Sequence, residues 1–211
     1  LKGNIAEALK YYEHFINQGF NDPRVFSNYG IILKDLGKLK DAEIALRKAI
    51  EINPQYADAF SNLGDILRDL GKLKEAELSY RKAIEINPND AIAHSNLGII
   101  LKDLYKLQEA ELYTRKAIEI NPDFAEAHYN LGNILRDLGN LQDAELSYRK
   151  AIEFKPDYAE AHYNLGIILK DLDNLQEAEL YTRKAIEVNP TYSEAHCNLG
   201  NILRDLGKSK E

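Results

Sequence analysis

The sequence predicts an all-α protein, an α-solenoid of antiparallel helix pairs that repeat every 34 residues. Two observations predict it: proline and glycine return at that interval, and each interval holds two amphipathic helical patterns. The prolines are Pro54, Pro88, Pro122, Pro156 and Pro190, and the glycines are Gly30, Gly64, Gly98, Gly132, Gly166 and Gly200. The composition agrees, because Ala, Leu, Ile, Glu and Lys are abundant while Pro and Gly are scarce.

The period divides the chain into the parts of a single array, 1–211. Residues 1–22 have the pattern of a second helix alone, from a truncated repeat. Five full repeats follow at 23–56, 57–90, 91–124, 125–158 and 159–192. Residues 193–211 have the pattern of a first helix alone, again from a truncated repeat.

Repeat 125–158 shows why each half forms a helix. The first half carries an apolar stripe at helical spacing, formed by Ala127, Leu131, Ile134 and Leu138. Gly139 follows, where a helix stop needs left-handed backbone. The second half carries the stripe Leu141, Ala144, Tyr148, Ala151 and Ile152, and Pro156 blocks its continuation. Glu145 stands four residues before Arg149, a favourable helical pair that we interpret as part of a solvated face.

This pattern resembles the tetratricopeptide repeat, with its L-G pair, A-x₃-aromatic and proline. In repeat 57–90 the matching residues are Phe60, Leu63, Gly64, Leu67, Ala76, Tyr80, Ala83 and Pro88. The resemblance covers the whole chain, and it implies a right-handed superhelix whose first helices line a concave groove. The chain departs from the family pattern at its two aromatic positions. The first aromatic is replaced by histidine at His94, His128, His162 and His196, and the second is replaced at Leu46, Thr114 and Thr182.

A second period of two repeats runs inside the first. The first helices alternate between GIILKD, as at 30–35, and GDILRD or GNILRD, as at 64–69 and 132–137. The second helices alternate between ELSYRK, at 77–82 and 145–150, and ELYTRK, at 111–116 and 179–184. We interpret this alternation as duplication of repeat pairs, which copies residues whether or not they act in function.

Charge and composition disfavour several kinds of partner. The net charge of −7 argues against nucleic acid and against an anionic membrane surface, because both need a concentrated positive face. No apolar run approaches the roughly 18 residues of a membrane helix. Cys197 is the only cysteine, so we expect no internal disulfide and an intracellular, cytoplasmic location. The chain has no methionine, so we expect it to be a fragment of a longer protein.

No catalytic, cofactor or metal-binding constellation is predicted, so we do not expect an enzyme. The recurring histidines are a full repeat apart and cannot share one metal ion at ligand distances of about 2.0–2.1 Å. Their register is that of the packed aromatic in the family pattern, so we expect them to pack. If they are buried and neutral, stability should fall at mildly acidic pH.

Asparagine also returns every 34 residues, at Asn28, Asn62, Asn96, Asn130, Asn164 and Asn198. An amide offers an acceptor and two donors, so a row of amides can hold an extended peptide backbone whatever its side chains. In this detail the array resembles the superhelix of O-linked N-acetylglucosamine transferases, which implies peptide binding in the groove. The alternative is that these amides only bond neighbouring backbone. Replacing Asn96, Asn130 and Asn164 with alanine distinguishes the two hypotheses. If the amides bind peptide, the replacement should weaken peptide binding with little loss of stability.

Residues beside the asparagines are predicted to select the peptide's side chains. They are Tyr129, Tyr163, Asp65, Asn133 and Asn201, with Lys102, Arg136 and Lys170 from a basic row that an acidic row accompanies. Because apolar Ile31, Ile99 and Ile167 alternate with the polar residues, an extended peptide of interspersed apolar and polar residues should fit. Serine, tyrosine or cysteine at the expected lysine positions disfavours capture of an acidic C-terminal tail.

The sequence therefore predicts a non-catalytic module that binds extended peptide segments of partner proteins. Two alternatives stay open: a recruiting region of a larger, transferase-like enzyme, and a purely structural scaffold. Neither end of the array has a polar cap, so we also expect head-to-tail self-association. The faces involved would be Ala6, Leu9, Tyr12, Phe15 and Ile16 at one end and Ala195, Leu199, Ile202 and Leu203 at the other.

Overall fold

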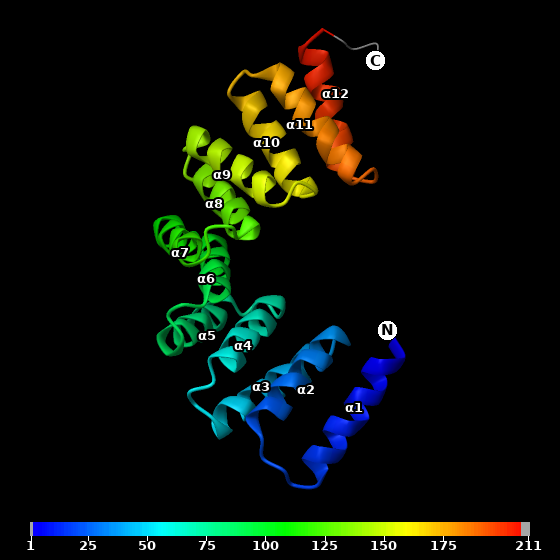
Figure 1. Cartoon of the computed structure of the whole chain (residues 1–211), viewed down its shortest axis with the longest axis vertical. Coiled ribbons are helices and arrows are strands. Elements are labelled where there is room, and N and C mark those ends of the chain that lie inside the picture. The colour runs from blue at the N-terminus through cyan, green and yellow to red at the C-terminus, as the bar shows by residue number, and fades with distance from the viewer. Residues whose placement is uncertain (1, 208–211) are drawn as a thin grey trace. The chain divides into compact units, whose positions relative to one another are not determined.

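The computed structural model describes the backbone of residues 2–207 and the side chains of residue 5 and of 7–207. Residues 1 and 208–211 of the two predicted truncated repeats, and the Ala6 side chain, lie outside the described residues. Over 2–207 the chain forms twelve α-helices and no strand (Figure 1). They are α1 (Lys2–Asn17), α2 (Pro23–Asp35), α3 (Leu39–Ile52), α4 (Ala57–Asp69), α5 (Leu73–Ile86), α6 (Ala91–Asp103), α7 (Leu107–Ile120), α8 (Ala125–Asp137), α9 (Leu141–Phe154), α10 (Ala159–Asp171), α11 (Leu175–Val188) and α12 (Ser193–Asp205). The predicted all-α fold class of paired helices is confirmed.

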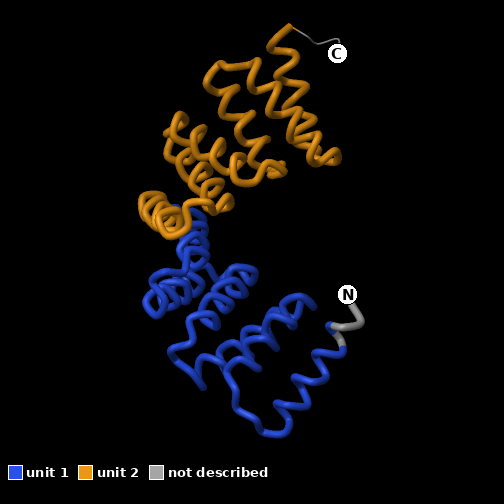
Figure 2. The backbone as a smooth tube through the Cα atoms, in the orientation of Figure 1, with its two compact units in different colours: residues 1–105 blue, residues 106–211 orange. Residues whose placement is uncertain are grey.

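The chain forms two compact units, residues 1–105 and 106–211 (Figure 2). Within each unit, a first helix packs on the second helix of its own repeat and on the second helix of the repeat before it, as α10 packs on α11 and α9. First helices also touch one another, α2 with α4 and α10 with α12. None of the helices in the described part of the chain is both long and apolar enough to span a bilayer.

Glycine ends the first helices as predicted. Gly139 has φ of 81°, its N–H donates to the Arg136 carbonyl, and the following N–H donates to Leu135, so the last carbonyls of α8 are satisfied. Gly37, Gly71 and Gly207 have the same left-handed backbone. Tyr105 and Asp173 adopt it without glycine's freedom, which costs about 1–2 kcal/mol for an L-residue.

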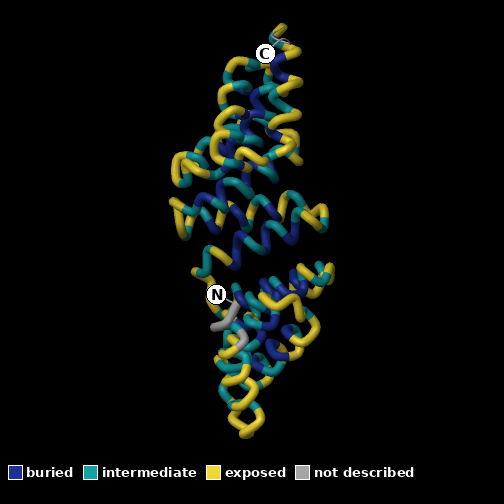
Figure 3. The backbone as a smooth tube through the Cα atoms, turned by 90° about the vertical axis from the view of Figure 1, so that its right-hand side faces the viewer, coloured by how far each residue is buried: buried dark blue, intermediate teal, exposed yellow. Residues whose placement is uncertain are grey.

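The second recurring glycine allows close helix packing. A Cβ on Gly132 would lie 2.6 Å from the Tyr148 ring, and one on Gly64 would lie 2.7 Å from Tyr80. Both rings are fully buried. In the unit 106–211 the Tyr148 ring joins a core cluster with Leu131, Leu165, Ile168 and Ile202. Figure 3 shows buried backbone inside the helix pairs and exposed backbone at many of the turns.

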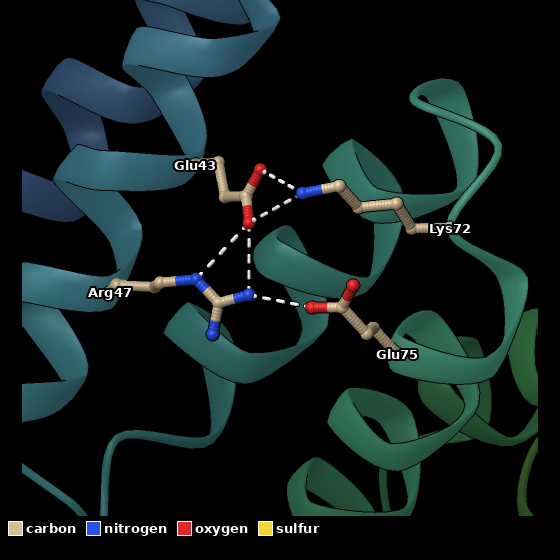
Figure 4. Close-up of polar contacts among 4 residues, drawn as sticks. All are labelled: Glu43, Arg47, Lys72 and Glu75. Atoms are coloured by element: carbon tan, nitrogen blue, oxygen red, sulfur yellow. Dashed lines mark hydrogen bonds and ion pairs between the residues drawn. The ribbon is translucent and has the colours of Figure 1, made fainter.

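Charged side chains join successive second helices. Figure 4 shows Glu43 on α3 accepting from Arg47, 2.9 Å away, and from Lys72, 2.8 Å away near the start of α5. Arg47 also pairs with Glu75 at 2.8 Å. These neighbours, Lys72 first, lower the pKa of Glu43. The helical pairing of glutamate with an arginine four residues later, predicted for Glu145 and Arg149, is present there and also here, where it belongs to a network between repeats.

The prediction of an open face on α12 is wrong for three of its four residues. Ala195, Ile202 and Leu203 are buried, whereas Leu199 is half-buried. A first helix in this packing has two apolar sides, and one of them already rests on the preceding second helix, α11. The open side is marked instead by Gly200, where an added Cβ would meet no atom of residues 2–207 within 4 Å. At the other end Leu9, Tyr12, Phe15 and Ile16 are half-buried.

Candidate functional site

The six asparagines occupy equivalent positions on first helices but differ in surroundings. Asn28 on α2 is exposed, whereas Asn164 on α10 is only 7% exposed. The Asn62 amide donates to the Ser27 hydroxyl, 3.3 Å away, and the Asn198 amide donates to the Thr182 hydroxyl, also at 3.3 Å. Each of these bonds reaches back to the preceding repeat, so at these positions the amide nitrogen holds the array together.

Asn164 belongs to a buried network between α8, α9 and α10. Its Nδ2 donates to the Tyr129 hydroxyl at 3.2 Å and to the Asn133 Oδ1 at 3.0 Å. The same Asn133 oxygen accepts from the Tyr148 hydroxyl at 2.8 Å. Burial is the main cause that raises the pKa of Tyr148, so its phenol stays neutral and donates.

Asp65 plays the part of Asn133 in the unit 1–105. Its Oδ1 accepts from the buried Tyr80 hydroxyl at 2.5 Å, and burial raises the pKa of that phenol. In both repeats the second helix carries an inward tyrosine, Tyr80 or Tyr148. In both, the residue three positions after the asparagine of the first helix is polar, Asp65 or Asn133, and accepts from that tyrosine. Ile31 takes the place where the second helix carries Leu46 instead. The alternation attributed to peptide selectivity has a packing cause within the fold.

The basic row is paired with the acidic row. Lys170 Nζ lies 3.3 Å from Asp205, on the next first helix, while Lys102 and Arg136 lie 3.3 Å and 3.5 Å from the aspartate that follows each in sequence. All three basic side chains are about one-third exposed. Neutralised cations of this kind do not attract a polyanion, although they can still donate to a peptide carbonyl.

Tyrosines gather on the first helices of the unit 106–211. Tyr129 lies 4.9 Å from Tyr158, and Tyr163 lies 4.9 Å from Tyr192, measured between ring centroids. Burial raises the pKa of Tyr192 to about 12. The sequence prediction missed Tyr158 and Tyr192, although a signal was present, since an aromatic residue directly precedes four of the first helices at multiples of 34 residues. That set is Tyr56, Phe124, Tyr158 and Tyr192.

A pocket of about 370 Å³ opens between α10 and α12. Its lining brings together three predicted site residues, Tyr163, Asn198 and Asn201, with Cys197. Cys197 is an exposed free thiol, and Asn201 is exposed beside it. We call the surface formed by Tyr163, Asn198 and Asn201 the first-helix face.

Comparison with family models identifies the repeat. A model described as TPR repeat matches residues 30–67, 64–104 and 132–173, which together make up more than half of the chain. The chain belongs to the tetratricopeptide repeat family. Further models described as tetratricopeptide repeat match 159–192, 91–124, and 113–145 with 181–211. Tetratricopeptide repeats are in general protein–protein interaction modules, and this chain is one of that general kind.

Solved structures of other tetratricopeptide proteins are similar. YrrB, described as a TPR protein with an unusual peptide-binding site, is 25% identical with a TM-score of 0.68, over 88% of this chain and 96% of YrrB. MamA is 25% identical with a TM-score of 0.70, over 78% of this chain and 96% of MamA. PilF of Pseudomonas aeruginosa, at 20% identity, TM-score 0.79 and 89% and 86% coverage, shows the fold alone. No curated protein sequence matches the chain.

The histidines at the first aromatic position of the tetratricopeptide pattern pack as predicted in three repeats. His94, His128 and His162 are buried, and each Nε2 lies 2.8–3.0 Å from the carbonyl of the proline six residues earlier. His196 keeps the same bond to Pro190 but is exposed, because it lies on the open side of α12. An Nε2 beside a carbonyl must carry the proton, so each of these rings anchors its own loop.

The predicted site residues therefore fall into separate groups. In the unit 106–211, Tyr129, Asn133 and Asn164 share one buried network, whereas Tyr163, Asn198 and Asn201 share the pocket. In the unit 1–105, Asn62 and Asp65 bond within the fold, and Asn28 is exposed. Asn96 lies beside the Tyr80 hydroxyl, and Asn130 is half-buried on α8.

Proposed function

We propose that the first-helix face binds an extended segment of a partner protein and that this chain carries out no catalysis. The observation that carries the proposal is the pocket between α10 and α12, because Tyr163, Asn198 and Asn201 line it together. An amide pair beside an aromatic wall can bond peptide backbone on one side and pack an apolar side chain on the other. YrrB, a TPR protein with an unusual peptide-binding site, supports the proposal by similarity.

The asparagine row divides into structural and binding members. Asn164 is buried, and its amide nitrogen serves two bonds inside the fold, so we assign it a structural role. The Asn198 amide nitrogen donates to Thr182, but its carbonyl oxygen can still accept from a peptide N–H. Asn201 lies exposed at the pocket and has both halves of its amide available there. We therefore propose that binding concentrates on α10 and α12.

The pocket favours a particular peptide. Cys197 and the Tyr163 ring offer an apolar surface, so a medium-sized apolar side chain fits between them. Glu194 also lines the pocket and disfavours an acidic residue beside that side chain. An extended segment with an apolar residue among neutral or basic ones is the partner we propose. The exposed free thiol of Cys197 is consistent with an intracellular, reducing location.

A peptide-library selection against the whole chain tests this function. Peptides selected by the unmodified protein should bind about tenfold or more weakly to Tyr163→Ala and to Asn201→Ala, since each variant removes a pocket wall or a backbone partner. Asn28→Ala is the matched control: it changes the same residue type, in the same register, outside the proposed face. Equal binding by all three variants, with urea midpoints showing that each is folded, overturns the proposal.

Head-to-tail self-association stays a second proposal, through a different part of α12 than first predicted. Among the described residues, Gly200 has no neighbour within 4 Å of an added Cβ, and Leu199 is half-buried, so this side can accept another helix. The half-buried Leu9, Tyr12 and Phe15 of α1 are the complementary surface. Light scattering should show a mass that rises with concentration, and Leu199→Glu should abolish the rise. A constant monomer mass at high concentration contradicts association.

A further inference from the structure

Tyr181 fills a site enclosed by three helices on the second-helix side of the unit 106–211. Its ring on α11 stacks on the His162 ring of α10, with 5.9 Å between centroids and 25° between planes. Its hydroxyl accepts from Arg149 Nη1 of α9 at 2.8 Å. The arginine Cζ also lies 5.2 Å from the ring centroid. An imidazole face and a guanidinium thus hold one phenol.

One repeat earlier no tyrosine occupies the corresponding site, although the Phe154 ring of α9 stacks on His128 with 5.4 Å between ring centroids. Arg115 on α7 and His128 on α8 take the positions of Arg149 and His162, but Ser147 on α9 takes the position of Tyr181. The short Ser147 side chain turns back and donates to the Asp143 carbonyl at 2.8 Å. A cleft of about 400 Å³ remains, lined by these three residues with Ile118, Leu131 and Leu146. That volume lies in the range of about 300–1,000 Å³ for small-ligand sites.

Ile118, Leu131 and Leu146 give this cleft apolar walls, and the charged side chains Arg115, Lys150 and Glu119 also line it. Leu146 is 61% exposed at its rim. Arg115 pairs with Glu111 on its own helix, and Lys150 pairs with Glu153, so the charges around the mouth are largely neutralised. The unit 1–105 carries the same cleft, of about 350 Å³, lined by Arg47, Phe60 and Ser79 among others. Both clefts occur where the second helix reads ELSYRK.

We propose that the cleft between α7, α8 and α9 binds a tyrosine side chain of a partner protein, in the place that Tyr181 fills one repeat later. The ring lies beside His128, which also stacks on Phe154, and against Leu146, and the phenol oxygen accepts from Arg115. The corresponding cleft between α3, α4 and α5 is a second site of the same chemistry, with Phe60 in place of the imidazole. This interaction surface is separate from the first-helix face and needs no residue of it.

N-acetyl-tyrosinamide is the probe for the test, titrated into the whole chain with methyl NMR as the readout. The Leu146 methyl resonances should shift in a saturable way, and N-acetyl-leucinamide should bind about threefold or more weakly because it lacks the ring and the hydroxyl. Ser147→Tyr should fill the cleft from within and abolish the Leu146 shift. Ser147→Ala, the control, should leave it unchanged.

The reverse substitution makes the test independent of how well Ser147→Tyr folds. Tyr181→Ser should open a new cleft beside Leu180, which holds the position of Leu146, and the Leu180 methyls should then respond to the probe. Asn201→Ala should not alter either response, which separates this site from the peptide-binding face. Absence of a saturable Leu146 shift in the unmodified protein overturns the proposal. So does an undiminished shift in folded Ser147→Tyr.

Discussion

Replacing Asn164 with alanine separates the two interpretations of the asparagine row. The side chain is 7% exposed, and its Nδ2 bridges α10 to Tyr129 and Asn133 on α8 at 3.2 Å and 3.0 Å. If the amide is there for a peptide, removal should leave stability nearly unchanged, as the sequence alone suggested. If it holds successive repeats together, removal must destabilise the unit 106–211 with no peptide present.

The magnitude follows from the two bonds. Each neutral hydrogen bond contributes about 0.5–1.5 kcal/mol net, so the pair contributes about 2 kcal/mol. Alanine is the better helix former by about 0.5 kcal/mol, which offsets part of the loss. The partners are not stranded, because Asn133 still accepts from Tyr148 and the half-buried Tyr129 hydroxyl can reach water. The expected net loss is about 1.5 kcal/mol of unfolding free energy.

Urea unfolding followed by circular dichroism measures this loss, and amide hydrogen exchange locates it. A repeat array opens by nearest-neighbour units, so exchange should accelerate most in α8 and α10. Asn28→Ala is the control, because Asn28 is exposed and donates no side-chain hydrogen bond within the described residues. It should be neutral or slightly stabilising. Equal unfolding free energies for Asn164→Ala and Asn28→Ala would refute the structural role argued for Asn164.

Three further substitutions or conditions probe the tyrosine packing. Asn133→Ile should lower the free energy of urea unfolding by about 1–3 kcal/mol, because it leaves the buried Tyr148 phenol without its acceptor. Adding Tyr148→Leu should recover part of that loss in a double-mutant cycle, and additive losses would contradict the coupling. Gly132→Ala should destabilise by about 1–3 kcal/mol, since its Cβ would lie 2.6 Å from the Tyr148 ring, whereas Gly200→Ala, with open space around it, should be neutral or stabilising; equal thermal midpoints contradict this reasoning. Burial raises the pKa of Tyr80 above its ordinary 10.0, so the stabilisation from its neutral phenol is complete below pH 10.0 and is lost as the pH rises above that value. Tyr80→Phe should therefore flatten the decrease of unfolding free energy with alkaline pH. An unchanged slope speaks against this role of Tyr80.

Helix positions could be predicted from the sequence because their limits depend on local chemistry. Gly139 ends α8 through its own backbone freedom, and Pro156 lies just beyond the end of α9. The register of the asparagines follows from the same 34-residue count. For these features a residue and its near neighbours contain all the information that is needed.

Hydrogen-bond partners could not be predicted in this way. Asn133 and Tyr148 are 15 residues apart on different helices, and the periodicity of either helix is unaffected by the bond between them. The burial of Ala195 and Ile202 likewise depends on which side of α12 meets α11. Helical periodicity shows that a residue lies on the apolar face of its helix, but it does not show which neighbouring helix covers that residue.

The alternation of the second helices has a single physical description. In ELSYRK the tyrosine points inward, as Tyr148 does to Asn133, and the serine before it leaves an outer cleft open. In ELYTRK the tyrosine stands one place earlier and fills that outer site, as Tyr181 does, while buried Thr182 lies inward against Gly166. Each such second helix thus has one tyrosine and two places for it. The inner place requires a polar residue on the first helix, and the outer place closes a cleft. A two-residue exchange on the second helix therefore changes the shape of the outer surface, and it occurs together with a change of polarity at one position of the first helix.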